Sequence, residues 1–312
     1  MRLIRSRKVW YWIAVAAAVI AAAGWLYLES SRIEVRTVNI HLPDLSPADD
    51  GFSVALLSDQ HFGPGDRGRA RRIAETANRL KPDAILLLGD YINGSPDPRR
   101  SISMPELAGF VKALRAPYGV YAVTGNHEMW YGRTRVVSAL EAGGAAVITG
   151  RLVRLMLPSG GALQLVGVPD RKTERPHPFP GVSPREPLLI AMHDPGSILK
   201  LPAEYRRGFA VAGDTHGGQL RLYPGAGGTS WRQVFRYLSI ELGIAKREDK
   251  EPIVFFDRWL TDYHGRKLYI TSGIGTARLK LRIFCRPEIA LLKLRSAPEK
   301  ADTDFIKPLE IP

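Results

Sequence analysis

Cysteine is almost absent from this 312-residue chain, in which Cys285 is the only one. A single thiol excludes an intrachain disulfide and a thiolate-rich zinc module, and we expect it to pack as a small buried hydrophobe. The sequence also lacks an internal repeat and any low-complexity tract apart from an alanine-rich stretch near the N-terminus. The chain is therefore expected to be globular, with its chemistry carried by groups other than sulfur.

Acidic residues are scarce relative to basic ones, with 31 Asp and Glu against 44 Lys and Arg and a formal charge of +13. Such an excess favours anionic partners, which include nucleic acid, a membrane surface and a phosphorylated substrate. No nucleic-acid-binding module is recognisable, so we predict no nucleic-acid partner. The hydrophobic content of 45% is enough for a sizeable core in one large domain or two small ones.

The N-terminal segment has the pattern of a transmembrane helix. Four basic residues stand in the first eight positions: Arg2, Arg5, Arg7 and Lys8. The next twenty residues, Val9 to Leu28, carry no charge and have aromatic residues at both ends, as a bilayer-spanning helix does. The basic flank predicts a cytoplasmic N-terminus, with the rest of the chain on the external or periplasmic side of the inner (plasma) membrane.

A cleaved signal peptide is the alternative for this segment, because small alanines at positions 21 to 23 suit a peptidase. The apolar run is longer than the usual signal core of about 7 to 15 residues, and aromatic residues follow the alanines. We therefore favour an uncleaved single-pass anchor, with the lipid bilayer as its partner.

Composition divides the chain into four parts. Residues 1–30 are the basic flank and anchor, and residues 31–50 are a junction that contains an edge strand from Ile33 to Leu42. Residues 51–297 are expected to form one domain, followed by a polar tail at 298–312. Within the domain, residues 222–267 hold two aromatic-rich stretches, which predict either a functional lid or a subdomain with its own core.

Apolar runs rich in Val, Ile and Leu predict strands buried on both faces. There are eight such runs: Val54–Leu57, Ala84–Leu88, Val120–Val123, Leu163–Val168, Leu188–Met192, Phe209–Ala212, Leu268–Thr271 and Ile289–Leu294. Helical patterns lie between the early runs, at residues 66–80, 104–114 and 133–144. This alternation predicts a layered α/β fold, in which helices flank mixed β-sheets, after one N-terminal transmembrane helix.

Polar clusters follow five of these runs directly. They are "SDQH" with Asp59 and His61, "GD" with Asp90, "GNHE" with Asn126, His127 and Glu128, "HD" with His193, and "GDTHGG" with Asp214 and His216. Because ligands bind at the carboxyl ends of strands in α/β sheets, we expect all five clusters to meet on one edge of the sheet. Turn formation explains Gly, Asn and Asp at such positions, but histidine is not a typical turn-forming residue, so turns do not explain four histidines.

The donor types in these clusters suit a pair of divalent cations. Carboxylate, carboxamide oxygen and imidazole are ligands for hard or borderline ions, and thiolate is missing. Two ions about 3.5 to 4 Å apart clamp the oxygens of a phosphoryl group during in-line attack. The motifs therefore predict metal-assisted hydrolysis at phosphorus.

The order of the five motifs resembles that of the calcineurin-like metallophosphoesterases, over roughly residues 50–295. The tail "SGIGTARLKLRIFCRPEIALLKL", Ser272 to Leu294, is similar to a branch of small bacterial membrane-bound or exported members. That branch includes UDP-2,3-diacylglucosamine diphosphatases and less defined phosphodiesterases. The resemblance implies the metallophosphoesterase fold and a hydrolase whose nucleophile is a metal-bridging hydroxide.

The resemblance also implies a role for each residue of the motifs. Asp59, His61 and His216 would bind the first metal, and Asp90 would bridge both ions. Asn126 and His193 would bind the second metal, with Asn126 also close to substrate. His127 would contact the phosphate and assist the leaving group, oriented by Glu128. The expected cofactors are two divalent ions, manganese first, with magnesium, iron or zinc as alternatives.

Asp214 departs from the family pattern, which usually has a histidine there for the second metal. The carboxylate either ligates directly, or binds through water or turns toward a neighbouring partner and leaves the second metal weaker, or marks a degenerate site. Direct ligation is favoured because the other motif positions are intact. An added negative charge also favours a harder ion, manganese or magnesium, over zinc.

The anchor, the arginines of residues 67–72 and the aromatic insertion favour a lipid-linked or membrane-proximal phosphoester as substrate. We therefore predict a phosphodiesterase or pyrophosphatase. One alternative is a UDP-2,3-diacylglucosamine pyrophosphatase of lipid A synthesis, which requires a cytoplasmic domain. Another is a non-catalytic membrane-anchored binding protein with an impaired second metal site.

Overall fold

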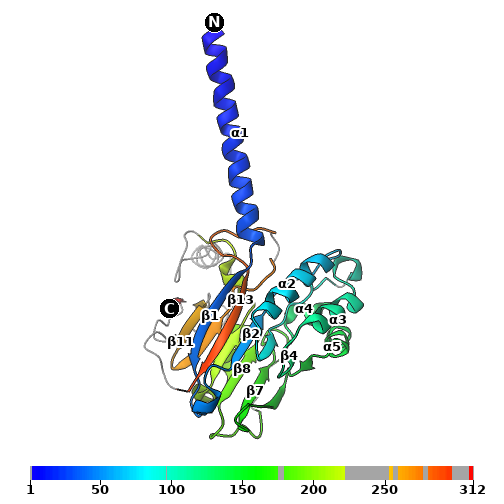
Figure 1. Cartoon of the computed structure of the whole chain (residues 1–312), viewed down its shortest axis with the longest axis vertical. Coiled ribbons are helices and arrows are strands. Elements are labelled where there is room, and N and C mark those ends of the chain that lie inside the picture. Colours follow the sequence, from blue (N-terminus) through cyan, green and yellow to red (C-terminus); the bar gives the residue numbers. More distant parts are fainter. Residues whose placement is uncertain are drawn as a thin grey trace.

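A long N-terminal helix stands on a layered α/β body in the computed structural model (Figure 1). The structure describes residues 2–95, 97–174, 179–221, 253–255, 259–276, 280–296 and 309–311. Most of residues 222–267, where we predicted a lid or subdomain, lies outside the described residues.

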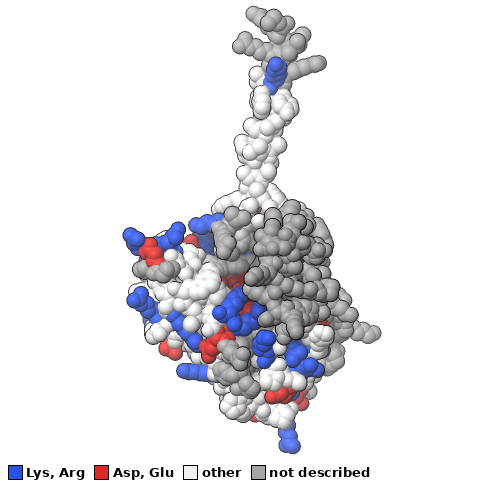
Figure 2. Space-filling view, turned by 180° about the vertical axis from the view of Figure 1, so that it is seen from behind, with Lys and Arg blue, Asp and Glu red and all other residues white. Residues whose placement is uncertain are grey.

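The N-terminal helix α1 (Arg2–Ser31) contains a stretch, Lys8–Ser31, that is long and apolar enough to span a membrane. At 1.5 Å per residue this stretch measures about 36 Å, against about 30 Å for the hydrocarbon core of a bilayer. In Figure 2 the exposed surface of this helix is neither blue nor red along most of its length above the body. A signal sequence has the same features, so permanent anchoring stays a prediction.

The first sheet has six strands in the order β1, β13, β2, β3, β4, β5. Strands β2 to β5 are parallel, β13 is antiparallel to β2, and β1 is parallel to β13. The strand bounds are β1 (Glu34–His41), β2 (Ser53–Leu57), β3 (Ala84–Leu87), β4 (Val120–Ala122), β5 (Ala146–Val147) and β13 (Glu288–Arg295).

The second sheet also has six strands, in the order β11, β12, β9, β8, β7, β6. The four inner strands are parallel, and the two edge strands are antiparallel to their neighbours. The bounds are β6 (Arg151–Met156), β7 (Ala162–Val168), β8 (Leu188–Met192), β9 (Phe209–Ala212), β11 (Trp259–Tyr263) and β12 (Arg266–Ile270). A separate antiparallel pair joins β10 (Ile253–Phe255) to β14 (Leu309–Ile311).

The inner faces of the two sheets pack against each other, because alternate side chains of every strand point to opposite faces. Leu56 of β2 and Val211 of β9 lie in this shared core, whereas Leu57 and Ala212 point outward. Helices α2 (Arg67–Arg79), α3 (Met104–Ala113) and α5 (Arg133–Ala142) cover the outer face of the first sheet. The 3-10 helices η3 (Pro195–Lys200) and η4 (Ala203–Arg207) cover the outer face of the second.

The remaining helical segments are short. They are η1 (Pro47–Asp49), η2 (Pro98–Arg100), α4 (Asn126–Tyr131) and η5 (His216–Gly218). Two of them, α4 and η5, begin at residues of the predicted metal motifs.

The prediction of a layered α/β fold with mixed sheets flanked by helices is confirmed. All eight apolar runs are strands, and the three helical patterns are α2, α3 and α5. Two expectations need correction. The polar clusters belong to two sheets rather than to one, because the chain crosses to a second sheet after β5. Residues 259–267 are not part of a lid, because they form β11 and the start of β12 within the second sheet.

Strand direction places the carboxyl ends of the first sheet at the end of the body that carries α1. Strand β1 begins three residues after α1 ends, so its amino end lies beside the helix. Strand β13 runs parallel to β1, and β2 runs antiparallel to β13. The chain therefore leaves β2, β3 and β4 toward α1, and Figure 1 shows the helix projecting from this end.

Arg282 holds this end of the body together from the inside. Its side chain is fully buried, and its guanidinium group donates hydrogen bonds to five backbone carbonyl groups. The acceptors are the carbonyl oxygens of His216, Ser272, Gly273, Gly275 and Cys285. The backbone N–H of Arg282 donates to Ser30 Oγ of α1 at 2.8 Å. One residue thus ties α1 to the segment that carries His216.

Arg282→Met should lower the free energy of unfolding by about 3 kcal/mol or more, because several buried carbonyl groups lose their donors. Thermal unfolding of the full chain in detergent should show a drop in Tm of roughly 6 °C or more. Arg99→Met is the matched control, since Arg99 is exposed and, among the described residues, pairs only with Asp97, at 3.0 Å. Equal Tm values for the two variants would show that Arg282 does not stabilise the fold.

Candidate metal centre

The backbone at the predicted ligand positions has an unusual conformation. Five of these residues have a positive φ: Asp59 (55°), His61 (44°), Asp90 (54°), Asp214 (63°) and His216 (53°). The left-handed region is costly for residues other than glycine and is concentrated at functional sites. The strained backbone lowers the stability of the fold, and it turns these side chains inward immediately after β2, β3 and β9.

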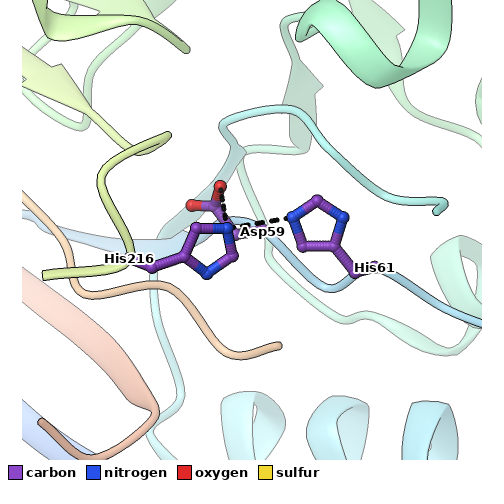
Figure 3. Close-up of side chains that lie close together, drawn as sticks. All are labelled: Asp59, His61 and His216. Atoms are coloured by element: carbon purple, nitrogen blue, oxygen red, sulfur yellow. Dashed lines mark hydrogen bonds and ion pairs between the residues drawn. The ribbon is translucent and has the colours of Figure 1, made fainter. Parts of the chain in front are cut away.

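Asp59, His61 and His216 form the first cluster, and their side chains point toward one another (Figure 3). The Nε2 atoms of the two histidines lie 3.1 Å apart, and Nε2 of His216 lies 3.6 Å from Oδ1 of Asp59. The two imidazole nitrogens lie within hydrogen-bonding distance of each other. A neutral imidazole whose proton is on Nδ1 presents the lone pair of Nε2. A shared cation is the natural partner for such a pair of lone pairs.

Asp90 occupies the centre of the site. Its Oδ2 atom lies 3.2 Å from Nε2 of His193, 3.6 Å from Nε2 of His61 and 3.7 Å from Nε2 of His127. Two further groups of donors therefore share this carboxylate, one with His61 and His127 and one with Asp59 and His193. Within each group the candidate ligand atoms lie within 4.8 Å of one another.

His193 is held in one orientation by a backbone contact. Its Nδ1 atom lies 2.8 Å from the carbonyl oxygen of Leu88, so this nitrogen carries the donated proton. Nε2 then faces Asp90 at 3.2 Å and Asp214 at 3.4 Å. Fixing the tautomer in this way is how proteins prepare an imidazole for metal binding.

Buried polar atoms without hydrogen-bond partners show that these residues fit bound cations. Oδ1 of Asp59 and Oδ1 of Asn126 are both buried, and neither has a hydrogen-bond partner among the described residues. Such atoms normally cost free energy in a folded protein. A divalent ion coordinated by the carboxylate and carboxamide oxygens would remove that cost.

The pKa values of the buried site residues are shifted in ways that bear on cation binding. Burial raises the pKa of Asp59 to about 7, and burial lowers the pKa of His61 to about 4. Burial opposes the charge of Asp90 as well, but His193, followed by His61 and His127, holds the pKa of Asp90 below its usual value. Burial likewise opposes the charge of His193, yet Asp90 and Asp214 raise the pKa of that ring well above its usual value. Cation binding would therefore displace a proton from His193.

Asn126, His127 and Glu128 open helix α4 at the carboxyl end of β4. The His127 side chain is 22% exposed, against 7% or less for the other three imidazoles, so it is the one most open to a substrate. Gly94 packs directly on the His127 ring, where a Cβ atom would lie only 2.6 Å from it. Glu128 is fully buried and accepts hydrogen bonds from the backbone N–H groups of Asp90, Tyr91 and Gly125 at 2.7 to 2.9 Å.

Asp214 faces the second-metal side of the site but is paired with a lysine. Both carboxylate oxygens accept hydrogen bonds from Nζ of Lys172, at 2.6 and 2.7 Å. Burial opposes the charge of Asp214, but His193 and then Lys172 hold its pKa well below the usual value. The Lys172 ammonium group therefore offsets the extra negative charge from which we expected a preference for a harder ion.

Sequence reasoning missed Lys172, although a signal for it was present. "PDRK", residues 169–172, follows the apolar run at 163–168 as directly as the five recognised clusters follow theirs. It contains no histidine, so it did not stand out as a metal motif. All nine predicted site residues, from Asp59 to His216, are buried or half-buried at this one edge.

Comparison with known proteins agrees with this geometry. A family model described as calcineurin-like phosphoesterase matches residues 52–206. The chain is 26% identical over 295 residues to the uncharacterized metallophosphoesterase YkuE of Bacillus subtilis, covering 91% of this chain and 94% of that protein. It is 24% identical over 226 residues to a transmembrane protein with metallophosphoesterase domain from Bos taurus, covering 67% of this chain and 50% of the relative.

A solved structure from Danio rerio, described as a dimetal phosphatase, is 12% identical to the chain. It aligns with a TM-score of 0.41 over 72% of this chain and 88% of that one.

The aspartate and histidine donors at the meeting edges of two mixed sheets define a metallophosphoesterase, a hydrolase with a dimetal site. With the family match and the relatives above, the chain belongs to the calcineurin-like metallophosphoesterase superfamily.

Lys172→Met should raise the affinity of the metal-free protein for Mn²⁺ by about tenfold, or ~1.4 kcal/mol. Removing the ammonium group frees both Asp214 oxygens and removes a cation that repels the incoming ion. Isothermal titration calorimetry of the chelator-treated full chain measures this directly. Lys112→Met, on the exposed surface of α3, is the control. If both variants bind Mn²⁺ like the unchanged protein, Asp214 does not reach the second ion.

Proposed function

We propose that the protein is a dimetal phosphodiesterase or pyrophosphatase that acts at a membrane surface on a lipid-linked phosphoester. The central observation is the position of Asp90, whose carboxylate lies within 3.7 Å of three imidazole nitrogens from both sheets. A carboxylate shared between two groups of donors suits a pair of divalent ions better than a single one.

The proposed ligands follow from this arrangement. Asp59, His61 and His216 would hold the first ion, and Asp90 would bridge to the second. Asn126 and His193 would hold the second ion, completed by Asp214 once Lys172 yields one of its oxygens. When bound, the ions would supply Lewis-acid charge at the phosphoryl group and activate the attacking water.

His127 would contact the phosphate and give a proton to the leaving group, since it is the most exposed imidazole of the site. Glu128 would act as a positioning residue rather than orient the His127 ring. Its carboxylate is occupied by three backbone N–H groups and fixes the turn that carries Asp90 relative to the start of α4. Lys172 is a further candidate for contact with a phosphoryl oxygen, because its ammonium group lies at the same edge.

Manganese is our proposed native ion, with magnesium, iron or zinc as alternatives. Three imidazoles and three carboxylates make a mixed nitrogen and oxygen donor set, which suits borderline ions. Since Lys172 offsets the charge of Asp214, the preference rests on donor type rather than on charge.

The membrane location of the substrate is supported by the position of the site. The carboxyl ends of β2, β3 and β4 face the end of the body that carries α1. A relative of the chain is described as a transmembrane protein with the same domain. An anchored domain with this orientation presents its metal centre to the bilayer surface.

The full chain in detergent should hydrolyse bis(p-nitrophenyl) phosphate with Mn²⁺, and EDTA should abolish the reaction. Asp90→Asn should lower kcat about 100-fold or more, because it weakens both cation sites at once. Glu141→Gln, an exposed carboxylate on α5, is the control. Hydrolysis that persists in EDTA, or in the Asp90→Asn variant, would rule out the dimetal mechanism.

The body should lie on the external face of the membrane. The native Cys285 is only 1% exposed, so a membrane-impermeant maleimide should report only introduced cysteines. In intact cells of a Gram-negative host with a permeabilised outer membrane, Glu141→Cys should be labelled, and Ser6→Cys should be labelled only after lysis. The reverse pattern would place the body in the cytoplasm and favour the UDP-2,3-diacylglucosamine pyrophosphatase alternative.

A further inference from the structure

A cavity of about 560 Å³ lies between the end of α1, the first turns of α2 and the chain that leads into β13. Leu26 and Tyr27 of α1 line it, and so does His61 of the first metal cluster. The cavity therefore connects the predicted membrane segment to the metal centre. Its volume is within the range of about 300 to 1,000 Å³ that is typical of ligand sites.

Part of the cavity wall on the side of the body is apolar. Ile73 of α2 lines it together with Ile274 and Leu281. Ile73 and Ile274 are buried in the fold, so this wall is set by the core rather than by mobile surface side chains. An apolar channel that opens beside a bilayer-spanning helix suits a hydrocarbon chain.

The rim of the same cavity is basic. Arg72 and Lys280 line it, both are exposed, and neither forms an ion pair within the described part of the chain. Arg69, by contrast, is occupied by Asp66 at 2.8 Å and by the carbonyl oxygen of Gln60 at 2.7 Å. Burial opposes the charge of Asp66, and Lys280, after Arg69, helps to lower its pKa, but Lys280 forms no close ion pair with that carboxylate. Two exposed cations next to an apolar wall match a molecule with an anionic head and an apolar tail.

We propose that this cavity binds the hydrocarbon chain of a membrane phosphoester, with the ester at the metal centre and the chain along Leu26 and Tyr27. Arg72 and Lys280 attract the anionic head as the molecule leaves the leaflet next to the body. The inference rests on the proposed function and deepens it, because it gives α1 a part in substrate binding as well as in anchoring. The occupant is a lipid-linked phosphoester and not a soluble phosphate.

Two chromogenic diesters with the same leaving group test the proposal: p-nitrophenyl methyl phosphate and p-nitrophenyl dodecyl phosphate. The full chain is assayed with Mn²⁺ in phosphatidylcholine nanodiscs, and the ratio of kcat/KM for dodecyl to methyl ester is measured. Leu26→Trp, which fills the cavity, should lower this ratio about tenfold, since each buried methylene contributes roughly fourfold in affinity. Leu28 is two residues further along α1, is 59% exposed and does not line the cavity. Leu28→Trp should therefore leave the dodecyl-to-methyl ratio unchanged.

A change at the rim provides a second arm that leaves α1 intact. Arg72→Glu should raise KM for the dodecyl ester several-fold at low salt, and the effect should shrink as salt increases. Arg67→Glu is the matched control, because Arg67 is an exposed arginine of the same helix outside the cavity lining. Equal KM values for the two variants would contradict a role for the rim.

A binding measurement separates this proposal from the proposed function. A dodecylphosphonate with a diazirine on its chain is irradiated with metal-free protein, and crosslinks are mapped by mass spectrometry. We expect crosslinks at Ile274 and Leu281 in the unchanged protein. These crosslinks should be lost in Leu26→Trp and retained in Leu28→Trp. Crosslinks without hydrolysis of either diester would support the cavity and overturn the proposed function.

Hydrolysis of both diesters with the same ratio in the two tryptophan variants would have the opposite meaning. Any preference for the dodecyl ester would then come from its partitioning into the bilayer. The catalytic proposal would stand, and the cavity as a chain-binding site would be overturned.

Discussion

The face-to-face packing of the two six-stranded sheets is the constraint on which the site depends. Asp59, His61 and Asp90 come from the first sheet, whereas His193 and His216 come from the second. Neither sheet alone supplies a complete set of donors. The shared core that holds Leu56 against the second sheet therefore also sets the 3.2 Å approach of His193 to Asp90. Interior packing and metal binding are coupled, because a sliding of one sheet over the other would separate the donors.

Within that frame the loops are held under strain. Five of the predicted ligand residues have positive φ angles, each of which costs on the order of 1 kcal/mol for a residue other than glycine. Glu128 and Arg282 each stabilise one of the strained turns through hydrogen bonds to its backbone. The first accepts three backbone N–H groups around Asp90, and the second donates to the carbonyl of His216 and its neighbours. The backbone around Asp90 and His216 is thereby fixed before an ion arrives, so binding requires little backbone reorganisation there.

The fold and the aspartate and histidine donors of the site could be predicted from the sequence because both follow from local patterns. Apolar runs such as Leu188–Met192 mark strands, and the polar residues that follow them mark the carboxyl edge. What the sequence did not reveal depends on distant contacts. Strand β13, near the C-terminus, inserts between β1 and β2, and only that pairing shows that the site faces α1. Lys172 and Arg282 lie in irregular segments, where their partners 42 and 66 residues away give them their roles.

The connection between anchor and site is short and direct. Glu29 of α1 pairs with Arg286 at 2.9 Å, Ser30 accepts from the backbone of Arg282, and Arg282 in turn holds the His216 carbonyl. Only Arg32 and Ile33 separate α1 from β1, so no flexible linker lets the body move away from the helix. A bilayer around α1 would thus fix the height of the metal centre above it. In the anchored state that we propose, a domain held in this way would reach phosphoesters embedded in the adjacent leaflet and would not follow those that diffuse further off.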